Sequence, residues 1–301
     1  MSVTAILLII LSAFVHAGWN LLSKKTTPST SFFYLCNVVG CIVLLPIFIL
    51  YWKSLFLFPV EVWILLIFTG ISMSVYYIAL ATAYRHGDLS IAYPIARSSP
   101  IIVVAIVTFI LAQGHTITFL CVIGILLITA GCFILPMKNF SDIKLKNYLN
   151  ITCLFALISA FGTAGYSIID DNSLSILTHT NTIRLSVVQI TLLYSFFECI
   201  FIFSWLSIFI LFYKKEHTNF LNVFKMQKKN ALLAGIGIIV AYSLVLISMS
   251  FATNVSYVVA FRQLSIPIGA LGGIFLLKEP RYSTKYIAIL TIFIGLILVA
   301  L

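Results

Sequence analysis

The chain has 301 residues, of which 62% are hydrophobic and only 9% are charged. A soluble domain is about half apolar and about a quarter charged, so this composition excludes a water-soluble enzyme. The net charge of +10 indicates basic loops in contact with anionic lipid, and it requires no nucleic-acid partner. Because helices satisfy their own backbone groups in lipid, the sequence predicts an all-α polytopic membrane protein.

Ten apolar segments follow one another along the chain, each near the roughly 20 residues that a membrane span needs. In chain order they cover residues 4–22, 31–52, 62–84, 91–112, 116–135, 149–169, 185–212, 231–251, 256–277 and 283–301. The first lacks a basic region before its apolar core, so we expect a retained helix rather than a cleaved signal peptide. We expect the longest polar stretches, 137–148, 170–184 and 213–230, to lie outside the membrane.

An internal repeat relates the two halves of the chain. Residues 12–19 (SAFVHAGW) return as 159–166 (SAFGTAGY), with six of the eight positions identical or both aromatic. A second match, 165 residues apart, pairs Tyr77 with Tyr242 and Arg97 with Arg262. Two matches in the same order favour a true duplication over the chance similarity of apolar helices.

The repeat predicts the domain organisation. We expect a first five-helix repeat in residues 1–136, a linker in 137–148 and a second five-helix repeat in 149–301. Because five is an odd number of spans, the second repeat must be inverted relative to the first. Ten helices in two inverted repeats are typical of secondary transporters, whose substrate site lies between the two halves.

Basic residues are unevenly distributed over the links between spans. Of the 18 Lys and Arg residues, fourteen fall in the odd-numbered links, and only Lys53 and Arg184 fall in even-numbered ones. Since positively charged links stay in the cytoplasm, this count predicts that both termini lie outside.

Four ionisable residues lie inside the predicted spans: Arg97, Arg262, Glu198 and His16. A charge in the bilayer costs roughly 3 kcal/mol, so such residues are functional candidates. Guanidinium groups match carboxylate and phosphate, and we expect the two arginines to bind an anionic substrate group. The alternative is structural: one arginine pairs with Glu198 or caps backbone carbonyls, and so locks the bundle.

Further residues complete the predicted site. Glu198 and His16 are the candidates for proton coupling, although Glu198 has the alternative of facing lipid headgroups or a partner. We expect Pro94, Pro100 and Pro267 to kink or unwind the helices around the two arginines. The predicted substrate-binding residues are Arg97, Arg262, His16, Trp19, Asn20, Tyr77, Tyr166, Tyr242, Tyr257 and Gln263.

Several short motifs resemble the EamA-type transporters of the drug/metabolite transporter superfamily. They are RHGDLS at 85–90, YPIAR at 93–97, HAGWN at 16–20 and LKEP at 277–280. The resemblance implies ten helices in two inverted halves around a central cavity. It also implies export of amino acids or other small metabolites, commonly driven by protons. Related proteins usually keep both termini cytoplasmic, so resemblance and charge count leave the orientation open.

The function predicted from the sequence is secondary active transport by alternating access. The expected substrate is a small organic metabolite, an amino acid or another carboxylate or zwitterion, with proton coupling. The alternative is a flippase or transporter of a phosphorylated or lipid-linked substrate that uses the same arginines. We expect a multi-pass protein of the cell (inner) membrane, monomeric or homodimeric, in contact with lipid, without enzymatic activity, cofactor, metal or nucleic-acid partner.

Overall fold

The computed structural model describes residues 2–23, 29–86, 89–110, 118–135, 137–140, 151–180, 182–276, 278 and 280–300. This part of the chain is helical and contains no strand. Its main helices are α1 (Val3–Ser23), α2 (Thr30–Tyr51), α3 (Val60–His86), α4 (Leu89–Thr108), α5 (Phe119–Ile134), α6 (Ile151–His179), α7 (Val187–Phe212), α8 (Lys214–Met226), α9 (Lys228–Met249), α10 (Val255–Phe261), α11 (Ser265–Leu276) and α12 (Ser283–Ala300). Two 3-10 helices, η1 (Trp52–Leu57) and η6 (Arg262–Leu264), extend α2 and join α10 to α11.

Seven helices of the described residues are long and apolar enough to cross a membrane. They are Thr30–Leu57, Val60–Ala83, Ile151–His179, Val187–Phe212, Lys228–Met249, Val255–Leu276 and Ser283–Ala300. Three shorter apolar helices cover Val3–Trp19, Ser98–Val107 and Phe119–Ile134. The chain is therefore an all-helical, multi-pass membrane protein, and each of the ten predicted segments overlaps one of these helices.

Two of the predicted polar stretches contain helix. α6 continues to His179, ten residues beyond its predicted end, because the helical pattern of buried residues continues through Ser173, Leu174 and Leu177. The stretch predicted as a link after α7 contains α8, whose Glu216 and Val223 are buried. Both predictions were wrong because stretches with charged residues were taken to be links outside the membrane rather than helix.

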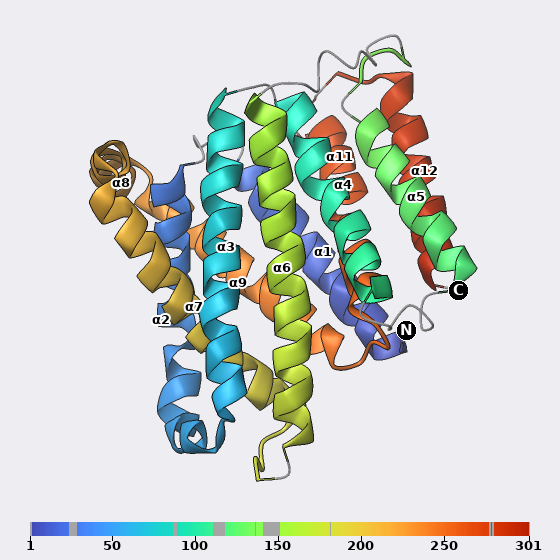
Figure 1. The fold of residues 1–301 in the computed structure, drawn as a ribbon. Helices are drawn as coiled ribbons and strands as arrows, with labels where there is room; N and C mark the ends of the chain where they lie inside the picture. The colour runs from blue at the N-terminus through green and yellow to red at the C-terminus, as the bar shows by residue number, and fades with distance from the viewer. Residues whose placement is uncertain are drawn as a thin grey trace.

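The helices pack in a regular set of pairs. α2 packs on α7, and α5 packs on α12. α6 packs on α3 and α4, and α1 packs on α9 and α11. α2 also packs on α9, and α3 packs on α7. The two termini lie on the same side of the bundle (Figure 1). α3, α6 and α9 cross its centre, so their facing side chains can enclose a site.

The crossing of α5 and α12 depends on glycine. A Cβ atom on Gly124 would lie 2.6 Å from the carbonyl oxygen of Gly295, and one on Gly295 would lie 2.7 Å from that of Gly124. Both distances are too short for a side chain, so these two backbones touch directly. Small residues let helices approach in this way in membranes.

Candidate functional site

A cavity lies in the centre of the bundle, enclosed by α1, α2, α3, α6, α7, α9 and η6. Its free volume is about 60 Å³, whereas pockets for drug-sized ligands measure roughly 300 Å³ or more. The cavity is therefore small for a drug-sized ligand in this structure. The predicted site residues that line the cavity are His16, Trp19, Tyr77, Tyr166, Glu198, Tyr242 and Arg262.

Arg262 is placed by a break in the helix that carries it. Residues Arg262–Leu264 form a 3-10 turn between α10 and α11. Pro267 has no N–H, so it cannot bond the carbonyl of the residue four positions earlier, Gln263. The Ser265 hydroxyl donates to the Arg262 carbonyl at 2.9 Å. The helix is therefore unwound at Arg262–Leu264, as expected beside Pro267. The unwinding expected at Pro94 and Pro100 is not observed, because α4 runs as continuous α-helix through both positions.

Two tyrosine rings hold the Arg262 guanidinium. Its Cζ lies 5.8 Å from the ring centroid of Tyr166 and 5.4 Å from that of Tyr242, both cation–π distances. Nη2 donates to the Tyr166 hydroxyl at 3.2 Å, while the buried Nη1 has no hydrogen-bond partner. No ion pair joins Arg262 to Glu198 in the part of the chain described above, so the structure does not show the Arg262–Glu198 pair of the structural alternative.

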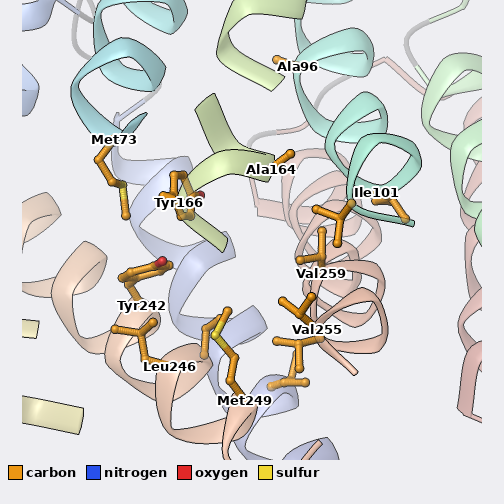
Figure 2. Close-up of a cluster of buried hydrophobic side chains, with 14 of the residues drawn as sticks. Met73, Ala96, Ile101, Ala164, Tyr166, Tyr242, Leu246, Met249, Val255 and Val259 are labelled. Carbon is orange, nitrogen blue, oxygen red and sulfur yellow. The ribbon is translucent and has the colours of Figure 1, made fainter. Parts of the chain in front are cut away.

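The tyrosines form a continuous aromatic wall. Tyr166 meets Tyr242 edge to face at 5.5 Å, and it meets Tyr76 at 5.9 Å. Tyr76 in turn contacts Tyr77, whose ring stacks on Phe33 at 4.9 Å. Figure 2 shows Tyr166 and Tyr242 approaching each other from α6 and α9. The wall surrounds the guanidinium on its apolar faces.

Apolar residues continue the core next to the aromatic wall. Leu246, Met249, Val255 and Val259 are all buried and belong to the same core cluster as Tyr166 and Tyr242. Figure 2 shows Leu246 and Met249 on the same helix as Tyr242.

α1 contributes two further cavity residues. His16 and Trp19 line the cavity and contact each other edge to face at 4.9 Å. The indole Nε1 of Trp19 is buried and has no partner. Trp19 is held in place by Gly237 of α9, where an added Cβ would lie 2.8 Å from the Trp19 Cβ.

Glu198 is buried in the middle of α7, with 2% of its surface exposed, and it lines the cavity. The alternative that it faces lipid headgroups or a partner is therefore wrong. Its Oε1 has no hydrogen-bond partner. Beside it, Asn37 of α2 donates from Nδ2 to the Cys199 carbonyl at 2.8 Å, which fixes α7 against α2.

Asp170 belongs to this site but was placed outside the membrane by the sequence prediction. It is fully buried in α6. Thr69 of α3 and Tyr194 of α7 donate to its Oδ1 at 2.6 and 2.7 Å, and the hydroxyl of Tyr242 donates to its Oδ2. The sequence does contain a signal, since buried polar residues recur at helical spacing along α6: Ser159, Thr163, Tyr166, Ser167, Asp170 and Ser173.

Two of the predicted residues that the structure describes, Tyr257 and Gln263, lie away from the cavity lining. The Tyr257 hydroxyl accepts the Thr118 amide at 3.4 Å, and Gln263 donates to the Val259 carbonyl at 3.1 Å. Neither lines the cavity. The side chains of Arg97 and Asn20 lie outside the described residues, and their roles stay predictions.

Comparison with known proteins relates the chain to one family. Residues 3–137 match the model of the EamA-like transporter family. The N-terminal part of the chain is therefore similar to this family. The match indicates a membrane transporter of the drug/metabolite transporter superfamily, a kind of protein that lies in a lipid bilayer and binds small molecules.

One solved structure shares the fold of nearly the whole chain. A protein of known crystal structure aligns with a TM-score of 0.71 at 16% identity, over 98% of this chain and 96% of its own. At that identity the similarity shows the fold alone. No curated protein matches the chain by sequence.

Proposed function

We propose that the chain is a secondary active transporter that moves a small organic carboxylate or zwitterion, such as an amino acid, by alternating access. The single observation that carries this proposal is the unpartnered Nη1 of Arg262 in the central cavity. A buried guanidinium N–H without a partner is costly. A ligand carboxylate would satisfy it with a charge-assisted hydrogen bond.

Alternating access needs two similar halves that can move against each other. Suppose that α1 to α5 correspond in order to α6, α7, α9, α10–α11 and α12. Each observed packing pair then has a counterpart in which the two halves are exchanged. The α3–α6 pair corresponds to α9–α1, the α4–α6 pair to α11–α1, and the α2–α9 pair to α7–α3. The pairs α2 on α7 and α5 on α12 are their own counterparts. This pattern supports ten spans in two inverted repeats, 1–136 and 149–301.

The charges around the cavity favour a carboxylate or zwitterion over a cation. Arg262 offers a donor to an anionic group, and Glu198 offers a carboxyl to an ammonium group. The aromatic wall gives a cavity with apolar faces and a few polar groups, which is typical of small-molecule sites. Glu198 and His16 remain the proton-coupling candidates among the lining residues.

Thermal stabilisation of the purified protein tests this proposal. A ligand that binds the folded state raises the midpoint by mass action. The panel holds amino acids, organic anions, phosphorylated metabolites and organic cations. We expect stabilisation by carboxylates or zwitterions in the wild type and in the Arg184→Ala control, whose arginine is exposed, and none in Arg262→Ala. Stabilisation by cations alone, retained in Arg262→Ala, would overturn the proposal, and stabilisation by phosphorylated compounds would favour the phosphorylated substrate.

A further inference from the structure

Two carboxyl groups lie beside the cavity arginine, one from α6 and one from α7. We propose that Asp170 and Glu198 form a coupled pair that holds a single proton next to Arg262, and that this proton travels with the substrate carboxylate. The claim that the proton travels with the substrate rests on the proposed function. The claim that the two carboxyl groups share one proton does not, because it concerns the substrate-free protein. Asp170 is the new element, since the lining residues alone would assign coupling to Glu198 or His16.

Asp170 provides the fixed negative charge of the pair. An ionised carboxylate only accepts hydrogen bonds, and all three polar neighbours of Asp170 donate to it through their hydroxyls: Thr69, Tyr194 and Tyr242. Tyr242 links this charge to the arginine, because its hydroxyl donates to Asp170 while its ring lies 5.4 Å from the guanidinium. Asp170 therefore balances the charge of Arg262 through a shared tyrosine.

Glu198 provides the exchangeable proton. Glu198 lies one helical turn after Tyr194 on α7, and the Tyr194 hydroxyl donates to Asp170 at 2.7 Å. Glu198 also lines the same cavity as Arg262. One guanidinium cannot neutralise two buried carboxylates, so one of them must carry a proton. Asp170 has its oxygens satisfied by donors, whereas Oε1 of Glu198 has no partner. An ionised oxygen left unpartnered in the interior is expensive, so the proton resides on Glu198 in this conformation.

Apart from Glu198, no described residue that lines the cavity carries a carboxyl group. The groups that face the pair from the packed elements are Tyr76 and Tyr77 of α3, Tyr166 of α6, Tyr194 and Cys199 of α7, Cys36 of α2, Tyr242 of α9 and Arg262 of η6. Asp171 follows Asp170 on α6, interacts with it electrostatically, and lines a separate polar pocket with Ser175 and His179. His16 of α1 lines the cavity itself.

Coupling follows from the charge balance. A substrate carboxylate at Nη1 of Arg262 brings a further negative charge, which Glu198 tolerates while it keeps its proton. Anion and proton therefore bind cooperatively, and by linkage each raises the affinity for the other. When the carboxylate leaves on the far side, the proton passes from the Glu198 carboxyl to water in the opened cavity. One carboxylate and one proton then cross together.

Infrared difference spectroscopy of the substrate-free protein tests the shared proton. At neutral pH the wild type and the matched control Asp171→Asn should show a protonated-carboxyl band that Glu198→Gln lacks. In Asp170→Asn the band should disappear at lower pH than in the wild type, because the neighbouring negative charge is gone. Tyr242→Phe, which removes only the hydroxyl donor, should also alter this titration and serves if Asp170→Asn does not fold. A band that persists in Glu198→Gln, or an identical titration in all variants, would overturn the proposal.

Proteoliposomes test the coupling. With a radiolabelled amino-acid mixture as probe, an imposed pH gradient should drive accumulation in the wild type and in Asp171→Asn. Accumulation in Glu198→Gln should fall to the level reached without a gradient. Gradient-driven accumulation that survives in Glu198→Gln would overturn the assignment of the proton to Glu198. Absence of any wild-type uptake would instead contradict the proposed function, with the infrared result still deciding the proton pair.

Discussion

The molecule contains two clusters of buried charge that are built in opposite ways. One cluster surrounds Glu216 of α8, at the end of the bundle away from the termini (Figure 1). The Glu216 carboxylate accepts hydrogen bonds from Arg85 Nη2 at 2.5 Å, from the Ser31 amide and hydroxyl at 3.1 and 2.9 Å, and from Asn219 at 3.1 Å. Every oxygen of this carboxylate has a partner, so the cluster ties α8 to α2 and α3.

The central cavity leaves several buried atoms without partners. They are Nη1 of Arg262, Oε1 of Glu198 and Nε1 of Trp19. Unsatisfied buried polar atoms cost stability, and charged groups within a membrane protein mark substrate and ion pathways. The difference indicates that the paired cluster stabilises the fold, whereas under the proposed function the unpaired atoms of the cavity would bind a ligand.

The largest expected effect separates the two clusters directly. Arg262→Ala should lower substrate affinity by roughly a hundredfold, about 3 kcal/mol, because a charge-assisted hydrogen bond is lost. Arg262→Lys should not restore the wild-type value, since an ammonium group lacks the planar fork between the two tyrosine rings. Radioligand binding measures this loss. An affinity of Arg262→Ala within twofold of the wild type would contradict the assignment of Arg262 to ligand binding.

Loss of the paired carboxylate should act on stability instead. Glu216→Ala should reduce the free energy of unfolding by about 2 kcal/mol, because the buried partners on Arg85 and Ser31 lose their acceptor. Transport per folded molecule should stay at the wild-type level. Thermal unfolding and uptake of the same preparation measure both, and lost uptake at unchanged stability would assign Glu216 to the transport machinery.

The pH dependence of stability sharpens the same contrast. Burial raises the pKa of Glu216, but the hydrogen bonds from Arg85 and Ser31 outweigh it and leave the pKa below its usual value. A lowered folded-state pKa stabilises the protein above the unfolded value, near 4.3, and this stability is lost as the pH falls through the folded value. Below about pH 4.3 the midpoint of the wild type should therefore fall further than that of Glu216→Gln. Parallel curves for the two proteins would contradict the assignment.

The smallest expected effect concerns the indole of Trp19. Trp19→Phe keeps the ring contact with His16 but removes the unpartnered Nε1 donor. If the substrate accepts from this donor, affinity should fall roughly fivefold, about 1 kcal/mol. The control is Trp63→Phe, because Trp63 packs on Phe197 away from the cavity lining. Equal affinity in the wild type and both variants would remove Trp19 from the set of ligand donors.

Most of the fold and about half of the candidate site were accessible from the sequence. Hydropathy located the apolar segments, and the internal repeat singled out Arg262 and Tyr242. Asp170 was missed because an acidic residue after an apolar run was scored as the end of the span, although the polar stripe of α6 continues through it. Glu216 was missed for the same reason.

The remaining errors concern helix rotation. Tyr257 and Gln263 were chosen because they lie close to Arg262 in the sequence. Which way a side chain points depends on how α10 and the 3-10 turn pack against their neighbours, and that tertiary information is absent from a local pattern. The contacts of Tyr257 with Thr118 and of Gln263 with Val259 show the consequence.

The most direct test of the central claim is a structure of the protein with the carboxylate or zwitterion that gives the greatest thermal stabilisation. The account predicts a ligand carboxylate oxygen about 2.9 Å from Nη1 of Arg262, between the rings of Tyr166 and Tyr242. A ligand bound elsewhere, for example in the polar pocket lined by Asp171 and His179, with Nη1 of Arg262 untouched, would contradict it.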